Sequence, residues 1–244
     1  MAVVSLADLA ERLATSASGS IVRKTEARDL RELAERVRPT TLAGERVIPV
    51  REDLARLFPF GGVRKGTVTQ VSHQGLLFAC LATAMAEGVW AAAVGASTLG
   101  LAAGAEQGVV LERFVVVARP PVEHATAVVA ALVDAVDLVI VGPGLITKTA
   151  DARRLTARLR ERGGVLFSLG AWPEAAELRL NVVGTTWSGA DAGHGHLSEW
   201  DLEVQVQGRG AASQGRRGTL VLAGSGEPLE TALPGAPSVL SKVG

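Results

Sequence analysis

The chain has a single cysteine, no tyrosine and no excess of charge of either sign. Its 244 residues carry 25 Lys and Arg against 25 Asp and Glu, so the formal net charge is +0. This balance removes the positive field that drives non-specific nucleic-acid binding, and we expect no strong intrinsic DNA binding. Cys80 lies in the apolar run LLFACLATAM and has no second cysteine to pair with. The pattern indicates a buried thiol in a reducing compartment.

Long apolar runs are missing as well. Each is interrupted by Gly, Glu or Arg before it reaches the roughly 20 residues that a membrane-spanning helix needs. Asp8, Glu11 and Arg12 occupy the N-terminal stretch, where a signal peptide would be apolar. We therefore expect a cytoplasmic protein with no membrane attachment. The hydrophobic content of 48% is enough for one sizeable core.

The sequence pattern divides the chain into three segments. Residues 1–45 place leucines at the spacing of one helix face and end near Pro39, which predicts an N-terminal helical segment. Residues 46–223 hold the strand and helix patterns of the core. Residues 224–244 are rich in Gly, Pro and Ser without a sustained period, which predicts a flexible C-terminal tail.

Within the core, short β-rich runs alternate with helical stretches. The pattern predicts strands at 47–50, 66–71, 89–95, 113–118, 137–141 and 165–169, and helices at 75–87, 99–107, 122–135 and 150–162. The runs FVVVA and LVIV are apolar at consecutive positions, which is typical of strands covered by helices on both faces. Alternating strands and helices predict an α/β fold with a doubly wound, mostly parallel sheet. Three further runs, at 177–187, 200–207 and 218–222, have no helices between them and predict an antiparallel extension at one sheet edge.

The turn from Val71 to Leu77 stands where a nucleotide-binding sheet carries its phosphate loop, between a strand and a helix. A P-loop needs the pattern Gly-x4-Gly-Lys-Ser/Thr, because its lysine neutralises the phosphates and its hydroxyl binds magnesium. This turn is too short and has no such Lys-Ser or Lys-Thr pair. Gly75 leaves weak anion binding at a helix N-terminus open beside a plain strand-to-helix turn. We expect His73 to be an exposed loop residue.

Two stretches of the core carry a resemblance to a known family. The segment FGGVRKGTVTQV at 60–71 resembles the glycine-rich approach to the P-loop in RecA recombinases. The segment from Trp90 to Gly144 is similar to the RecA core from its second core strand through its Walker B strand. The resemblance implies a RecA-like fold with the order of elements kept.

The same resemblance implies that two further residues needed for ATP hydrolysis are missing. Ser97 falls where RecA has the glutamate that activates the attacking water, and a hydroxyl is no base near neutral pH. Gly142 stands where the Walker B strand ends in the aspartate that holds magnesium. The two DNA-binding loops of RecA have no counterpart of similar length. With Gly75, Ser97 and Gly142 all degenerate, we expect no ATPase activity, no catalytic residue and no cofactor.

A third segment resembles one particular family of RecA-like proteins. The motif WSGADAGHGHL at 187–197, followed by a strand and an arginine-rich turn, is similar to the actinobacterial ImuA-prime family. That family belongs to the damage-inducible mutasome together with ImuB, a polymerase-like protein of the Y family, and an error-prone polymerase of the C family. The resemblance implies an adaptor that binds an ImuB-like partner, with RecA as a further candidate partner.

Six residues stand out as candidates for partner binding. Trp172, Trp187 and Trp200 are of the type enriched at interface hot spots, although burial in the sheet extension explains them equally well. Arg153, Arg154 and Arg158 lie on one expected helix as a local basic surface, or as a solvated face balanced by neighbouring acids. His194 and His196 with Asp191 have no cysteine near them and no second shell to hold them as zinc ligands, so we expect a glycine-rich turn and no metal.

Two other functions remain as alternatives to the adaptor. The first is a cell-division inhibitor resembling SulA, another RecA-fold protein without a P-loop, which binds a tubulin-like division protein. The second is a weak nucleotide-binding enzyme that uses an unconventional loop. A neighbouring polymerase-family gene favours the adaptor, filamentation on overexpression favours the inhibitor, and magnesium-dependent ATP turnover favours the enzyme.

Overall fold

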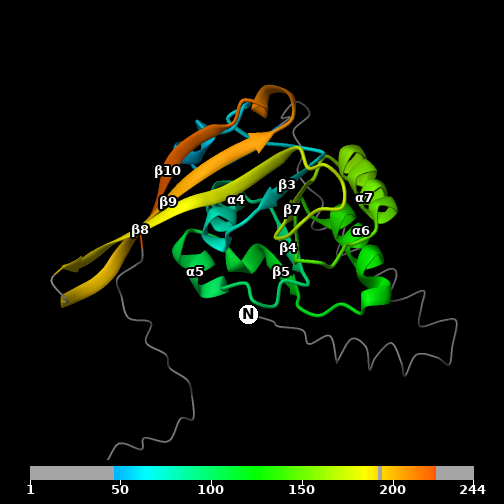
Figure 1. The fold of residues 1–244 in the computed structure, drawn as a ribbon. Helices are drawn as coiled ribbons and strands as arrows, with labels where there is room; N and C mark the ends of the chain where they lie inside the picture. The colour runs from blue at the N-terminus through cyan, green and yellow to red at the C-terminus, as the bar shows by residue number, and fades with distance from the viewer. Residues whose placement is uncertain (1–46, 192–193, 224–244) are drawn as a thin grey trace, which may run out of the picture.

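The computed structural model describes residues 47–191 and 194–223. The expected N-terminal helical segment and C-terminal tail lie outside these residues. The described part is an α/β structure built on one eight-stranded sheet with the strand order β10-β9-β8-β3-β7-β6-β4-β5. Figure 1 shows the sheet with helices on its two faces. The strands are β3 (Thr67–Val71), β4 (Ala91–Val94), β5 (Phe114–Val117), β6 (Leu138–Val141), β7 (Val165–Ser168), β8 (Leu178–Asp191), β9 (His194–Gly208) and β10 (Arg216–Ala223).

The sheet is parallel from β8 through β5 and antiparallel beyond β8. Neighbours β8/β3, β3/β7, β7/β6, β6/β4 and β4/β5 all run parallel. Strands β8/β9 and β9/β10 pair antiparallel. The predicted mostly parallel sheet with an antiparallel edge extension is therefore confirmed.

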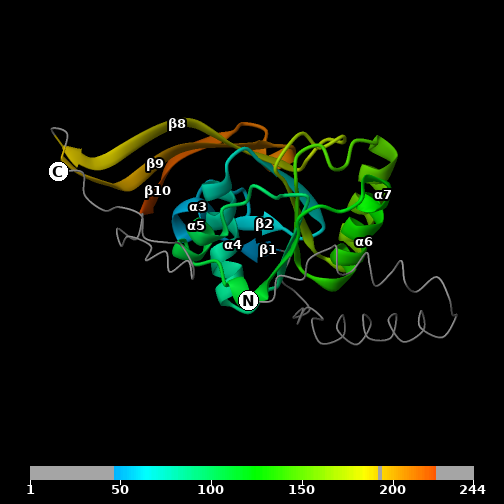
Figure 2. The ribbon, with the colours of Figure 1, turned by 90° about the horizontal axis from the view of Figure 1, so that it is seen from below.

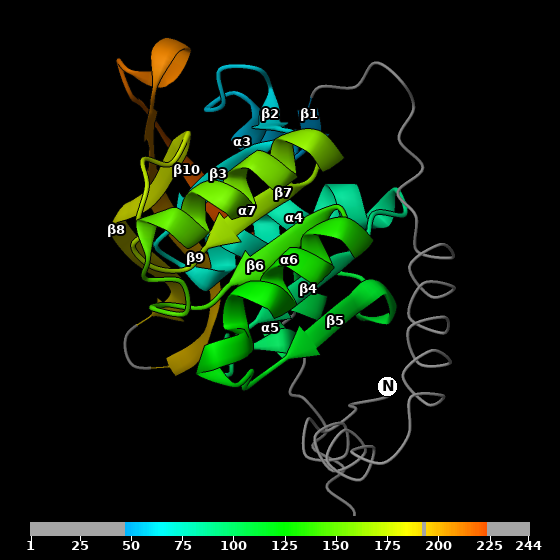
Figure 3. The same ribbon diagram turned by 90° about the vertical axis from the view of Figure 1, so that its right-hand side faces the viewer.

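Helices cover the two faces of the parallel strands. They are α3 (Glu52–Ala55), α4 (Gln74–Ala86), α5 (Leu101–Glu106), α6 (Ala125–Ala135) and α7 (Thr149–Arg162), with short 3-10 turns η1 (Leu111–Arg113), η2 (Val122–His124) and η3 (Gly210–Ala212). Figure 3 shows α6 and α7 across one side of the strands, and Figure 2 shows β8, β9 and β10 curving over the side that holds α4. Successive strand side chains point to opposite faces, so Phe167 joins the α4 cluster and Leu166 joins the α6–α7 cluster.

The two consecutive apolar runs differ in burial. All four residues of β6, the run LVIV, are buried, as expected for a strand covered on both faces. Strand β5 is the last strand of the sheet, and Val115 and Val116 remain 39% and 38% exposed. The prediction that FVVVA is covered on both faces is wrong, because an apolar run does not reveal that a strand has only one neighbour.

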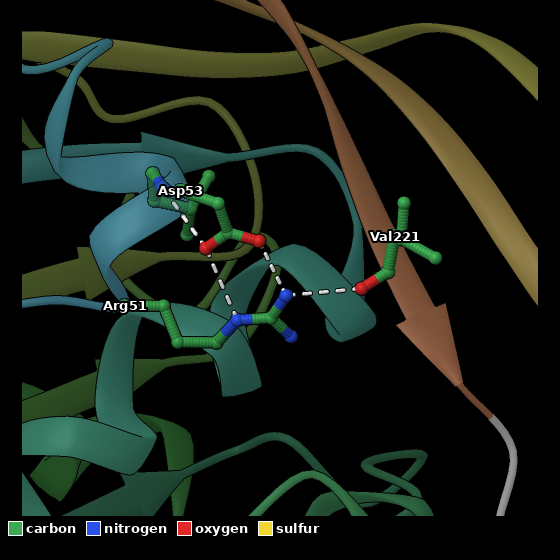
Figure 4. Close-up of polar contacts among 4 residues, drawn as sticks. Arg51, Asp53 and Val221 are labelled. Atoms are coloured by element: carbon green, nitrogen blue, oxygen red, sulfur yellow. Dashed lines mark hydrogen bonds and ion pairs between the residues drawn. The ribbon is translucent and has the colours of Figure 1, made fainter.

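The first expected strand lies outside the parallel sheet. Strand β1 (Val47–Pro49) pairs antiparallel with β2 (Gly62–Arg64) in a separate two-stranded sheet. Sequence reasoning missed β2 and α3, which are too short to show a period. Arg51 then fixes this region to β10, because its guanidinium donates to the Asp53 carboxylate and to the Val221 carbonyl at 3.0 Å (Figure 4).

Within residues 47–191 and 194–223, no helix combines the length and the apolar character that crossing a membrane requires.

Candidate functional site

The carboxyl ends of the parallel strands form the edge where ligands bind in open α/β sheets. Gly75 follows β3, Ser97 follows β4 and Gly142 follows β6. Strands β4 and β6 are direct neighbours, and only β7 separates β6 from β3. The three positions singled out by the RecA resemblance therefore follow strands at one edge.

The turn after β3 is closed by its own side chains. His73 is the N-cap of α4, and its Nδ1 accepts the Gly75 N–H at 3.1 Å. The Gln74 side chain donates to the Thr98 carbonyl at 3.1 Å and accepts the Gly100 N–H at 2.9 Å. His73 is half-buried, so the expectation of an exposed loop residue is wrong. Histidine is not among the residues preferred at helix N-caps, so no local pattern indicated this cap.

Strand β10 covers the first turn of α4. A Cβ atom added at Gly75 would lie 2.6 Å from Leu222 Cδ1 and 3.3 Å from His73 Nδ1. Gly75 is buried, so protein atoms occupy the space in front of its N–H. This packing could not be read from the sequence, because Leu222 is 147 positions away along the chain.

The position after β6 is closed by backbone. A Cβ atom at Gly142 would lie 2.0 Å from the Gly95 carbonyl oxygen and 3.0 Å from the Ala96 nitrogen. The Gly142 N–H donates to the Val94 carbonyl at 2.8 Å, which extends the pairing of β6 with β4 by one residue. Gly95 has a φ of +66°, and its backbone is overlaid by Leu145. No side chain fits at position 142 without separating the two strand ends.

An aromatic stack lies beside the α4 cap. Trp187 on β8 and Trp200 on β9 are directly opposite each other, with ring centroids 4.5 Å apart and planes at 9°. Trp200 meets the His73 ring edge to face at 4.6 Å and 81°. Trp187 ends the stack and is 50% exposed. Burial lowers the pKa of His73 from its ordinary value of 6.5.

Sequence reasoning selected both tryptophans but not their contact. The signal was present, because Trp187 and Trp200 flank a glycine-rich stretch as two strands of a hairpin do. The first of these two expected strands ended at Trp187 and the second began at Trp200. In the structure, β8 continues past Trp187 and β9 begins before Trp200.

Trp172 lies elsewhere. It is only 7% exposed and packs in the cluster on the α6–α7 face, away from the other two tryptophans. Its Nε1 finds no hydrogen-bond partner among the described residues. The structure therefore separates Trp172 from the pair formed by Trp187 and Trp200.

The three candidate arginines are each paired with an acid. Arg153 lies 3.7 Å from Glu174, Arg154 lies 3.5 Å from Asp151, and Arg158 bonds to the Asp134 carboxylate. Hydrogen bonding from Arg158 holds the pKa of Asp134 below its usual range. The surface of α7 that carries these arginines is thus locally neutralised, and partner binding through it stays a prediction.

The histidine motif gives no metal centre that can be described. The backbones of Asp191 and His194 pair at the end of the β8–β9 ladder. The side chains from 189 to 199 lie outside what the structure describes. Across the part that it does describe, no group of three or more His, Cys, Asp or Glu is placed to hold a metal ion.

A family model described as the MT3502 N-terminal domain matches residues 56–174. This range starts directly after α3 and includes β2 to β7 with α4 to α7, but it stops before β8 and both stacked tryptophans. Its description names a domain and states no activity. No curated protein matches the chain.

Proposed function

We propose that this chain is a non-catalytic, RecA-like accessory protein of damage-induced translesion synthesis. It acts as an adaptor that binds a polymerase-like partner of the Y family, similar to ImuB. RecA and an error-prone polymerase of the C family are further candidate members of the assembly. The pathway comes from the resemblance of the sequence, and the absence of ATPase chemistry comes from the residues at the former nucleotide edge.

The arrangement of the strands supports the RecA-like part of the proposal. Gly75, Ser97 and Gly142 stand for the phosphate loop, the general base and the magnesium-side acid, and each follows a parallel strand at the same edge. Three positions matched by sequence alone thus share one edge, where a nucleotide site of this kind requires them.

The packing at Gly142 carries the non-catalytic part. In a RecA-type site an aspartate at this position would reach the magnesium ion. Here the Gly95 carbonyl oxygen would lie 2.0 Å from any Cβ, and the Gly75 N–H already donates to His73. The ends of β4 and β6 fill the space that an aspartate side chain would need. The position therefore lacks the room for an aspartate as well as its carboxylate.

The exposed end of the aromatic stack supports the adaptor part. Trp187 is half exposed although its ring is held parallel to Trp200, so burying it against a partner costs little side-chain entropy. Rigid aromatic residues of this kind dominate binding hot spots. The family match stops at residue 174, so this surface belongs to the part of the chain outside the matched domain.

The test is co-purification of the full chain with the polymerase-like protein encoded in its own genome. We expect a stable complex with the wild type, a loss of at least tenfold in affinity with Trp187→Ala, and no change with Val116→Ala, an exposed apolar residue on β5. Deletion of residues 1–45 shows whether that segment contributes. Circular dichroism of each variant confirms folding.

Two results would overturn the proposal. No complex in the presence of RecA and single-stranded DNA would favour the division inhibitor, which is then tested against a tubulin-like partner. Magnesium-dependent ATP turnover that disappears when the Gly75 turn is altered would instead favour the enzyme.

A further inference from the structure

Strand β8 has an open edge along its second half. It pairs with β3 only over Leu178–Leu180, whereas its pairing with β9 continues to Asp191. The last contact on the β3 side is the Val182 N–H, which donates to Ser72 Oγ at 3.0 Å. From Val183 onward, no strand of the described structure pairs with this edge. Figure 1 shows this part of β8 and β9 projecting past the rest of the sheet.

The open edge carries no charged residue. From Val182 to Ala190 the sequence reads VVGTTWSGA. Val183 and the four residues Thr185–Ser188 are exposed. β-Branched and aromatic residues favour strands, and natural proteins usually protect exposed edges with charges or proline. An uncharged edge of this kind is typical of a surface that pairs with another strand.

The two outer edges of the sheet, formed by β10 and β5, differ from the open edge of β8. On β10, Arg216 and Arg217 supply charge, and the Arg51 guanidinium occupies the Val221 carbonyl (Figure 4). Strand β5 is only four residues long and lies between the charged residues Arg113 and Arg119. The uncharged run from Val182 to Ala190 is therefore longer than the four uncharged residues of β5 and, unlike β10, contains no arginine.

We propose that β8 pairs with β8 of a second copy of this chain, antiparallel along Gly184–Ser188, with the two-fold axis at Thr186. Backbone N–H and C=O groups alternate in direction along a strand. The Val182 N–H points to the open side, and the bulge at Val183 shifts the alternation by one residue. The free backbone N–H and C=O groups are therefore those of Thr185 and Trp187. In the dimer, Thr185 of each copy forms backbone hydrogen bonds with Trp187 of the other copy.

The absence of charge selects a second copy as the occupant. A two-fold axis places identical residues near each other, so a charged edge would repel itself. This edge has no charge to repel. An isolated two-stranded ribbon is marginally stable in water, and pairing converts it into a four-stranded sheet.

The same register explains the exposure of Trp187. Its side chain would face Thr185 of the second copy directly and would reach Trp187 of the second copy diagonally, within the range of aromatic side chains. The exposed end of the aromatic stack is then covered in the dimer, so a polymerase-like partner that binds Trp187 competes with the second copy for this surface. Because the paired segment is short, the interface is small, and we expect a weak dimer with a Kd on the order of micromolar.

Register-specific cross-linking of the full chain gives the first test. In the proposed register the two Thr186 residues form a non-hydrogen-bonded pair, with Cα atoms about 4.5 Å apart, as a disulfide requires. We expect T186C to form a covalent dimer under mild air oxidation. T219C is the matched control, because Thr219 is also exposed but lies on β10. Cys80 is buried with its pKa raised to about 12, so it does not compete.

Sedimentation of the full chain over a range of concentrations gives the second test. We expect Thr186→Lys to weaken self-association at least tenfold, because two lysines would meet at the axis, while Asp201 on β9 accommodates the lysine within each copy. Val116→Lys, on the open edge of β5, should leave it unchanged. A chain that is monomeric at every concentration, equal cross-linking of T186C and T219C, or an equal loss with Val116→Lys would overturn the proposal. The polymerase-like partner is absent from both tests, so their result is independent of the proposed function.

Discussion

At the residue scale, His73 joins three features at the turn between β3 and α4. Its Nδ1 caps α4, its ring supports Trp200, and burial lowers its pKa. Only the neutral imidazole can accept the Gly75 N–H, because both nitrogens of the protonated ring carry hydrogen. The positive ring would also face the positive end of the helix dipole. The cap therefore depends on an uncharged histidine.

This dependence predicts a pH effect on stability. The folded protein binds a proton at His73 less readily than the unfolded chain, so stability is complete above pH 6.5 and falls as the pH drops through the lowered pKa. His73→Asn keeps a neutral capping side chain and should reduce this loss. Urea unfolding of both proteins at pH 8 and pH 5 checks the effect. Equal pH dependence of the two proteins would contradict it.

Gly142 gives a second prediction at this scale. Gly142→Ala places a Cβ atom 2.0 Å from the Gly95 carbonyl oxygen and should destabilise the fold by more than about 2 kcal/mol. Gly142→Asp, which introduces the residue type that RecA has at the matched position of the resemblance, should cost at least as much and should not confer magnesium-dependent nucleotide binding. Gly100→Ala is the control, since its Cβ makes only an ordinary contact of 3.7 Å with Gln74. Thermal unfolding of the three variants compares them, and a neutral Gly142→Ala would show that the strand ends separate easily.

At the element scale, Asp134 connects α6 to α7. Its carboxylate accepts hydrogen bonds from Arg158 and from Arg162, the latter at 3.0 Å. Both arginine side chains are about half exposed, at 46% and 56%, so solvent screens the two ion pairs. The contact orients the helices and contributes little to stability.

We therefore expect Asp134→Asn to cost under about 1 kcal/mol at low salt and less at high salt. The pKa of Asp134 is lowered from 3.8, so this contribution is present above that pH and is lost as the pH falls through the lowered value. Urea unfolding at two salt concentrations measures it. Glu106→Gln on α5 is the control, because Glu106 is exposed and no ion pair of Glu106 occurs within the described part of the chain. A loss that is large and independent of salt would contradict the screening argument.

Periodicity predicted most elements within two residues, because parallel strands and amphipathic helices have strong local patterns. Strand β6 and helix α7 are examples: LVIV is apolar throughout, and α7 ends at Gly163 in the left-handed region with φ +75°. Local patterns failed where pairing decides the outcome. The run FVVV gives no sign that β5 is an edge, and short strands β1 and β2 depend on each other.

The candidate site was predicted only in its components. The resemblance placed Gly75, Ser97 and Gly142, and composition singled out Trp187 and Trp200. The sequence could not provide the contacts between distant segments, which are Leu222 against Gly75 and the Gly95 carbonyl against Gly142. Those contacts depend on the order of the strands in the sheet, which no local pattern records.

At the scale of the whole molecule, one sheet separates two hydrophobic clusters. Cys80 and Phe167 lie in the α4 cluster, whereas Leu166 and Trp172 lie in the α6–α7 cluster. Strand β7 is buried along its full length and contributes alternate side chains to both. Neither cluster can lose its packing while the other keeps an intact sheet, so residues 46–223 should behave as one domain.

This coupling predicts a single cooperative unfolding transition. Burial raises the pKa of Cys80 to about 12, so its thiol should resist labelling in the folded protein and react once the α4 face opens. Trp172 should report the other face through its fluorescence, measured with the remaining three tryptophans replaced by phenylalanine. We expect the two signals to change at the same urea concentration. Leu166→Ala and Phe167→Ala, each costing about 2–5 kcal/mol, should shift both signals together. Two separate midpoints, or a shift confined to the cluster that carries the substitution, would mean that the sheet does not couple its faces.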